Sequence, residues 1–394
     1  MNHLYKNGIL QTFGGLCALL VALGIGRFVY TALLPAMMSA HALDTKTAGS
    51  IAAWNLIGYL IGLLAMRNET HGKRRYMLFV FCFLMTIVTI AAMGFVHTSI
   101  PWHIIRFICG VVSGACFVLC SSIVLDTLMA LGKPALAGFL YSGVGCGIAI
   151  GAILTSPLKA LSGPDGAWIW MALVCIAPGI VALVALRPSV NRAPAAQGRT
   201  ASANGNKSGK PQPGYLTLLV AYGLEGFGYI IGMTFLVALV QTTTNSPALA
   251  GLSWVVVGCA AAVSAPLWRF AARKGYLPML IAALTLQAAG ALLPAFATTI
   301  PLILLGGLLL GGTFMGIVVL ALQYGVTLSG RSSAHTVAIL TGVYGIGQII
   351  GPYVAGVSAQ GRDFKFAFAL SSASLFLAAL LLIVNALQRR KTVR

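Results

Sequence analysis

The sequence predicts an all-α membrane protein whose twelve transmembrane helices form two pseudo-symmetric six-helix bundles. Three observations lead to this prediction: an apolar composition, twelve long apolar stretches and an internal repeat. Hydrophobic residues make up 59% of the 394 residues and charged residues only 8%, whereas about a quarter of a soluble domain is charged. In lipid such stretches must be helices, because open strands would leave backbone N–H and C=O groups unpaired.

Each of the twelve apolar stretches is long enough to cross a bilayer, which takes roughly 20 residues of helix. They lie at 10–39, 47–66, 76–96, 101–130, 134–158, 165–187, 215–241, 248–268, 276–297, 300–329, 333–359 and 364–388. One long connection interrupts them, and its Arg, Lys, Ser, Asn, Gly and Pro content predicts a flexible linker. We therefore expect a bundle at 1–187, a cytoplasmic linker at 188–214 and a second bundle at 215–394.

Short motifs recur in the two halves at a nearly constant offset. The recurring pairs are Thr98-Ser-Ile-Pro101 with Thr298-Thr-Ile-Pro301, Trp54-x3-Gly58 with Trp254-x3-Gly258, Gly145-x-Gly147-x3-Gly151 with Gly345-x-Gly347-x3-Gly351, and Gly24-x-Gly26 with Gly226-x-Gly228. The first three are offset by 200 residues and the last by 202. Two similar apolar halves are a common design of secondary transporters, in which the solute site lies on the pseudo-symmetry axis.

The net charge of +19 is a topology signal rather than a sign of nucleic-acid binding. Nineteen Lys and Arg residues fall in loops on one side of the expected spans, and four fall on the other. This bias predicts cytoplasmic N- and C-termini, in a bacterial inner membrane, with contacts to anionic lipids. No nucleic-acid partner is expected, since no basic folded domain lies outside the spans. The stretch after Lys6 is too long for a signal peptide and is expected to be a retained helix.

Three ionisable residues lie well inside the expected spans: Arg27, Arg106 and Glu225. Placing a charge there costs a few kcal/mol, so each needs a partner, a cavity or a function. Arg27 and Glu225 occupy corresponding helices at similar depth and carry opposite charges. They could form a structural ion pair between the halves, or they could bind the solute and a proton. A central carboxylate can exchange protons across a gated cavity, so Glu225 is the first candidate for proton coupling.

Polar aromatic residues share helical faces with these charges. Tyr30 and Thr31 lie beside Arg27, while Tyr222 and Tyr229 lie beside Glu225. Tyrosine suits a cavity wall because it offers both a ring and a hydroxyl, although plain packing is the alternative. The candidate solute-binding residues are Arg27, Tyr30, Thr31, Arg106, Tyr222, Glu225 and Tyr229.

Two further features are candidates for gating. Gly347, Gly351 and Pro352 combine close helix contact with a proline-weakened turn, which would allow bending; packing is the alternative. Asp126, near the inner end of 101–130, could meet Arg331 of the opposite half when the cytoplasmic side closes. The alternative partner of Asp126 is Lys133, at the membrane surface.

Other classes of function are disfavoured. The eight cysteines lie within spans and are expected to be buried small hydrophobes, and the six histidines are scattered along the sequence. No nucleophile motif, metal-ligand motif or ATP-binding loop occurs, so we expect no enzyme, no cofactor and no metal site. A channel or a solute sensor on a transporter scaffold remains the alternative class.

Over essentially its whole length, the chain resembles the major facilitator superfamily. The opening string from Gly24-Ile-Gly26-Arg27 to Pro35 resembles the first helix of the YbfB/YjiJ-like branch. Arg106-x3-Gly110-x3-Gly114 resembles the fourth-helix motif associated with proton coupling, and Gly347-x3-Gly351-Pro352 resembles the antiporter glycine-proline motif. The resemblance implies the major facilitator fold, alternating access and a proton-coupling role for Arg106.

Two departures from that family pattern are visible. Met66 stands at the usual acidic position of the loop after the second span, so Glu69 or Asp126 would have to supply the missing charge. The glycine-proline motif lies in the eleventh span rather than the fifth. The resemblance implies a monomeric, proton-coupled secondary transporter for a small organic solute, with export favoured over import. A solute importer or a transporter-like sensor is the alternative.

Overall fold

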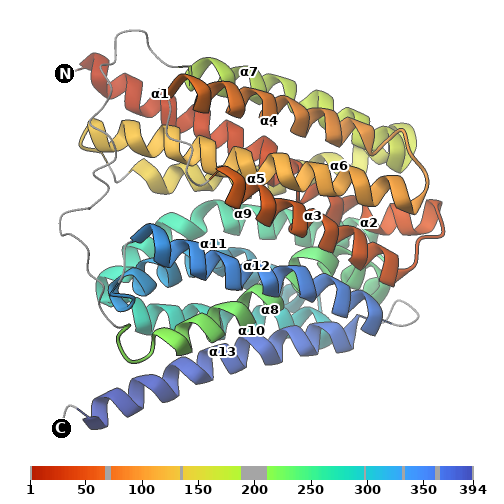
Figure 1. Cartoon of the computed structure of the whole chain (residues 1–394). Coiled ribbons are helices and arrows are strands. Elements are labelled where there is room, and N and C mark those ends of the chain that lie inside the picture. Colours follow the sequence, from red (N-terminus) through yellow and green to blue (C-terminus); the bar gives the residue numbers. More distant parts are fainter. Residues whose placement is uncertain are drawn as a thin grey trace. The chain divides into compact units, whose positions relative to one another are not determined.

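The computed structural model describes residues 2–66, 72–133, 136–187, 211–296, 299–330, 333–359 and 364–392. All elements assigned within these ranges are helices (Figure 1). The chain divides into two compact units, Met1–Arg199 and Thr200–Arg394. Most of the expected linker at 188–214 lies outside the described residues, which resume at 211.

The first unit contains seven α-helices and one π-helix among its described residues. They are α1 (Asn2–Leu19), the π-helix η1 (Leu20–Ile25), α2 (Val29–Ala40), α3 (Thr45–Met66), α4 (Gly72–Ala92), α5 (Ser99–Ala130), α6 (Ala137–Val174) and α7 (Ile176–Ala185). The first expected span, 10–39, is therefore not one continuous α-helix. Its path through α1, η1 and α2 brings backbone polar groups into the interior of the unit.

The second unit repeats this arrangement with fewer interruptions. Its described helices are α8 (Tyr215–Thr244), α9 (Pro247–Ala271), the 3₁₀-helix η3 (Ala272–Lys274), α10 (Tyr276–Phe296), α11 (Ile300–Leu328), α12 (Ser333–Ser358) and α13 (Lys365–Thr392). The same helix pairs pack in both units: α3 with α5 as α9 with α11, α4 with α5 as α10 with α11, and η1 with α6 as α8 with α12. The sequence repeat thus corresponds to a structural repeat.

Eleven helical stretches within the described residues are long and apolar enough to cross a membrane. Ten of them match single expected spans, and the remaining one, Ala137–Ala185, covers most of both 134–158 and 165–187. Inside it, Ser162 (φ −146°) and Gly163 (φ 70°) leave helical geometry. An unbroken helix of 49 residues would measure about 74 Å at 1.5 Å per residue, more than twice the roughly 30 Å hydrocarbon core.

Equivalent caps begin the second long helix of each unit. The Thr47 N–H donates to Asp44 Oδ1 at 2.6 Å, and the Leu249 N–H donates to Ser246 Oγ at 3.2 Å. These bonds satisfy amides that have no partner within the helix. The backbone bond from Thr47 lowers the pKa of the exposed Asp44. The two caps are 202 residues apart (246 − 44), the same offset as the Gly24 and Gly226 motifs.

Glycines hold neighbouring helices close together in both units. A Cβ on Gly110 would lie 2.0 Å from the Asn55 carbonyl oxygen, and one on Gly62 would lie 2.0 Å from that of Val111. In the second unit, a Cβ on Gly311 would lie 2.2 Å from the carbonyl oxygen of Val257. Backbones at this separation leave no space for any side chain, so these glycines are packing residues of α3·α5 and α9·α11.

The cysteines are all free thiols. Six are buried, as expected of small hydrophobes, but Cys146 is half-buried and Cys259 is exposed on α9. The expectation of uniform burial was therefore wrong for these two. An exposed thiol on an apolar helix is tolerated where the surrounding medium is lipid, because cysteine is only weakly polar.

Candidate functional site

The centre of the first unit is built around a break in its first membrane stretch. In η1 and just after it, the Gly26 N–H donates to the Val21 carbonyl at 2.9 Å and the Phe28 N–H to the Leu23 carbonyl at 3.3 Å. Both bonds span five residues, which is the π-helical pattern and occurs frequently at functional sites. The turn that follows presents the Gly26 and Arg27 carbonyls to the bundle interior.

Arg106 of α5 binds this turn. Its Nη1 donates to the Gly26 carbonyl at 2.7 Å and its Nη2 to the Arg27 carbonyl at 3.0 Å. The side chain is 2% exposed, and its Nε has no hydrogen-bond partner among the described residues. Asn55 of α3 donates to the Arg106 carbonyl at 2.8 Å. Arg106 therefore uses the two arms of its guanidinium fork to hold the broken helix against α5.

Tyr30 and Thr31 lie inside the first unit, directly after the break. Tyr30 donates its hydroxyl to the Ala48 carbonyl at 2.9 Å, and its ring centroid lies 5.1 Å from Arg106 Cζ. Both residues are buried, at 2% and 3% exposed. Since its hydroxyl is already bonded to α3 and its ring contacts Arg106, Tyr30 supports the position of α2 in this structure.

Arg27 lies against aromatic rings. Its Cζ is 4.7 Å from the ring centroid of Tyr59 and 5.0 Å from that of Phe28, distances typical of cation–π contacts. The Tyr59 ring neighbours Phe117 at 6.4 Å, and Phe117 neighbours Tyr141 at 5.9 Å. Arg27 and Arg106 are also close enough to interact electrostatically. The first unit thus concentrates two cations beside a row of aromatic rings.

Glu225 of α8 lies in the interior of the second unit. Its side chain is fully buried, at 0% exposed, and neither carboxylate oxygen has a hydrogen-bond partner of ordinary geometry among the described residues. Gln287 of α10, also buried, is close enough to interact with the carboxylate. The crevice of about 160 Å³ around Glu225 is lined by residues of α8, α10, α11 and α13 and has no room for a water molecule.

A stack of aromatic rings lies beside Glu225. Tyr222 and Tyr344 are 4.5 Å apart between centroids, Tyr344 and Tyr229 are 5.5 Å apart, and Tyr229 and Phe314 are 5.8 Å apart. Tyr344 interacts electrostatically with Glu225. Gln348 of α12 donates to the Tyr229 hydroxyl. The two sequence-predicted tyrosines, Tyr222 and Tyr229, therefore belong to one polar aromatic cluster with Glu225.

Arg27 and Glu225 belong to different units, and each has its own set of neighbours. The expected ion pair between them remains a prediction. Three buried side-chain amides that contact or neighbour Arg106, Glu225 and Tyr229 were not predicted, because only ionisable residues were sought within the spans. They are Asn55, Gln287 and Gln348. The high cost of burying any polar group would have identified these amides as well.

The glycines of the candidate gate pack α12 against α8. A Cβ on Gly347 would lie 2.3 Å from the Gly223 carbonyl oxygen, and one on Gly351 would lie 2.6 Å from that of Phe227. Pro352 follows inside α12, whose helix continues to Ser358. Both glycines therefore make the close helix contact that was expected, and their part in gating and a bend at Pro352 stay predictions.

Asp126 has a partner that was not proposed for it. Arg75 Nη1 of α4 donates to Asp126 Oδ2 at 2.6 Å, and the Asp126 side chain is 48% exposed. The Arg75–Asp126 pair is compatible with the hypothesis that Asp126 supplies the negative charge that the family pattern has at the position of Met66. Arg331 and Glu69, the other residues of these hypotheses, lie outside the described residues.

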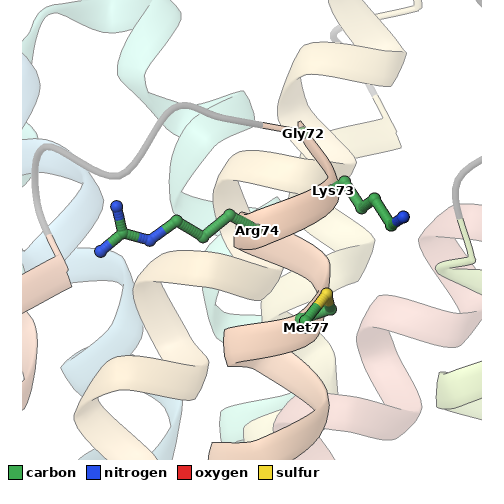
Figure 2. Close-up of a pocket in the computed structure, with 4 residues that line it drawn as sticks. All are labelled: Gly72, Lys73, Arg74 and Met77. Carbon is green, nitrogen blue, oxygen red and sulfur yellow. The ribbon is translucent and has the colours of Figure 1, made fainter.

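A hollow in the described part of the chain lies at the start of α4. It measures about 570 Å³ and is lined by Gly72, Lys73, Arg74 and Met77. Figure 2 shows Lys73 and Arg74 extending to opposite sides of the helix. A solute site is concave and has several polar groups that converge on the ligand. One turn of a single helix does not provide that arrangement, so this hollow is a feature of the surface.

The eleven long apolar helical stretches among the described residues and the repeated helix packing are those of a multi-pass membrane protein. Residues 19–383 match the model of a family described as the uncharacterised MFS-type transporter YbfB. The chain belongs to this family. No curated protein sequence matches the chain.

Solved structures share the fold at low sequence identity. A structure of a mutant form of the nucleoside transporter NupG superposes with a TM-score of 0.70 at 15% identity, covering 95% of this chain and 99% of that one. A second NupG structure gives a TM-score of 0.65 at 14% identity, with 98% and 99% coverage. These similarities establish the architecture of the chain.

Proposed function

We propose that this protein is a secondary active transporter that moves a small organic solute by alternating access and is driven by protons. Export is favoured over import by the family resemblance alone, since the glycine-proline motif lies in α12 rather than in the fifth span. The family membership supports transport, and the repeated halves support alternating access. We further propose a monomer in the bacterial inner membrane with both termini cytoplasmic, as the distribution of Lys and Arg indicates.

The single observation that supports proton coupling best is the environment of Glu225. A charged carboxylate with no hydrogen-bond partner of ordinary geometry would be held at a cost of several kcal/mol inside a bundle. Binding a proton neutralises the carboxylate and removes that cost. In another conformation, contact of the charged carboxylate with water would remove the same cost. Glu225 is thereby suited to take up and release a proton as access alternates.

The same geometry favours a proton role for Glu225 over direct solute contact. The crevice beside it admits no water molecule in this structure, so a solute has no access to the carboxylate. Tyr222 and Tyr229 would respond to the charge on Glu225 through the aromatic stack. We propose that Arg106 holds the turn at Gly26, and that its part in proton coupling is exerted through this turn.

Arg27 is our first candidate for solute binding in the first unit. Its guanidinium lies over the half-buried Tyr59, which offers both a ring face and a hydroxyl. An anionic or acceptor-rich part of a solute would find a rigid donor there. Tyr30 and Thr31, which follow Arg27 in the sequence, are proposed as further residues of this site.

Both termini can be cytoplasmic only if the number of crossings is even, and the eleven apolar helical stretches of the described residues make twelve crossings when Ala137–Ala185 counts as two. The non-helical backbone at Ser162 and Gly163 supports this number, because it separates 134–158 from 165–187. We propose that these two residues form the turn between the fifth and sixth crossings. We propose that the two functional halves are 1–187 and 215–394. The residues proposed to act in gating are Asp126, Arg331, Gly347, Gly351 and Pro352.

Two measurements on the purified protein test the proposal. A thermal-shift screen of metabolites identifies the solute, since ligands of the folded state stabilise it. Nucleosides belong in this screen because of the NupG structures. Counterflow in proteoliposomes then distinguishes a transporter from a solute sensor. A transporter exchanges labelled solute with saturation, whereas a sensor binds the solute without flux. Binding without counterflow would overturn the transport proposal.

A further inference from the structure

Two histidines and one aspartate that are distant in the sequence meet in the first unit. His41 is the residue that ends α2, His97 lies between α4 and α5, and Asp165 lies in α6 two residues after the break at Gly163. His41 Nε2 is 2.9 Å from Asp165 Oδ1, and His97 Nδ1 is 3.3 Å from Asp165 Oδ2. None of these residues takes part in the solute or proton sites proposed above.

The three side chains offer a suitable ligand set for a metal ion. Their ligand atoms all lie within 4.8 Å of one another. Ligand atoms at 2.0–2.1 Å from a tetrahedral zinc ion are about 3.3 Å apart. The 3.3 Å between His97 and Asp165 equals that value, while the 2.9 Å between His41 and the other oxygen of Asp165 is the length of a hydrogen bond, which metal binding would replace. Imidazole nitrogen and carboxylate oxygen are ligands that zinc and neighbouring transition-metal ions accept.

Neighbouring groups fix the orientation of the imidazoles and leave the cluster accessible. The buried Trp102 meets the His41 ring edge-on at 5.1 Å, and the His41 and His97 rings stack at 5.5 Å. The His41 side chain is 14% exposed, Asp165 30% and His97 58%. An ion can therefore enter from the exposed side, where three protein ligands leave a fourth position for water.

We propose that His41, His97 and Asp165 bind one divalent transition-metal ion, in the first place zinc. The ion would join the end of α2, the α4–α5 connection and the broken region of α6 within the first unit. The expectation that the chain has no metal site is replaced by this proposal. No sequence motif indicated the cluster, because the three residues are 56 (97 − 41) and 68 (165 − 97) positions apart.

Zinc titration of the full-length protein tests the site. The protein is purified with a histidine-free tag and titrated with zinc chloride by calorimetry. We expect one zinc per chain, with affinity at least about tenfold lower in His97→Gln and in Asp165→Asn. His103→Gln is the matched control, because His103 contacts Ser50 and Ser99 outside the cluster and should keep wild-type affinity. Thermal unfolding without metal verifies that each variant is folded.

Cobalt substitution provides a second readout that does not depend on transport. Cobalt(II) bound by two imidazoles and a carboxylate should give visible d–d bands without the near-ultraviolet charge-transfer band of a thiolate. The bands should disappear in His97→Gln, which should fold normally because the His97 side chain is exposed. Absence of zinc binding to the wild-type protein, unchanged affinity in His97→Gln, or a thiolate spectrum would each overturn the proposal.

Discussion

At the scale of single residues, Arg106 illustrates how a charge is accommodated inside a helical bundle. Its guanidinium donates to the carbonyls of Gly26 and Arg27, at a turn where the first membrane stretch departs from α-helical geometry. The charge stabilises the turn, and the turn supplies acceptors for the charge. Neither feature is stable alone in an apolar interior, since each would leave polar groups unpaired.

We therefore predict that Arg106→Lys destabilises the first unit. Lysine keeps the charge but lacks the planar fork, so at least one of the two bonds to the turn is lost. A hydrogen bond to a charged group contributes about 1.5–3 kcal/mol, and the free energy of unfolding in detergent should fall by about that amount. Arg75→Lys is the control, because the carboxylate of its partner Asp126 is 48% exposed, and an ion pair open to water contributes at most about 1 kcal/mol. Equal stabilities of the two variants would contradict the role of the fork.

The sequence could identify Arg106 as a residue that needs partners, but not which partners. Those are backbone carbonyls, and they become available only because η1 is π-helical and the chain turns at Gly26. No residue pattern in the apolar string predicts a π-helix. The same limit applies to Glu225, whose depth was predictable, while its enclosure by four helices of its own unit was not.

At the scale of helices, close backbone contact at glycines defines the repeated core. Gly24 and Gly147 pack η1 against α6, with a hypothetical Cβ on Gly147 only 2.3 Å from the Leu20 carbonyl oxygen. Gly347 packs α12 against α8 in the same way. The recurrence of these glycines in the sequence is thus explained by equivalent helix contacts in the two units.

We predict opposite effects for two Gly→Ala changes in the second unit. Gly311→Ala should destabilise by about 1–3 kcal/mol, because the new methyl group would overlap the Val257 carbonyl. Gly251→Ala should be neutral or stabilising by up to about 1 kcal/mol, since no atom lies within 4 Å of its Cβ position and alanine favours the helix. Unfolding measurements that show no difference between the two variants would refute the close packing of α9 and α11.

At the scale of the whole molecule, the number of crossings depends on the break at Ser162 and Gly163. The two separate apolar stretches, 134–158 and 165–187, predicted two helices here, and the backbone angles depart from helical values between them. Most of the helix boundaries were predictable because long apolar stretches must be helical in lipid. The cluster of His41, His97 and Asp165 was not predictable, because it forms only when the fold brings together three segments that are distant in the sequence.

We predict that residue 162 lies on the extracytoplasmic face and residue 73 on the cytoplasmic face. In a cysteine-free background, Ser162→Cys in intact cells should react with a membrane-impermeant maleimide. Lys73→Cys, in the first turn of α4, should react only after permeabilisation. Protection of Ser162→Cys until permeabilisation would mean that Ala137–Ala185 does not return through the membrane at this point.

The coupling of protons to transport is tested most sharply by Glu225→Gln. In proteoliposomes, a pH gradient should drive solute accumulation by the wild-type protein and by Asp126→Asn, which removes a half-exposed surface acid. Glu225→Gln should show no gradient-driven accumulation but should retain solute exchange, because the amide cannot take up a proton. Undiminished gradient-driven accumulation in Glu225→Gln would contradict the proposal that this buried carboxylate couples protons to transport.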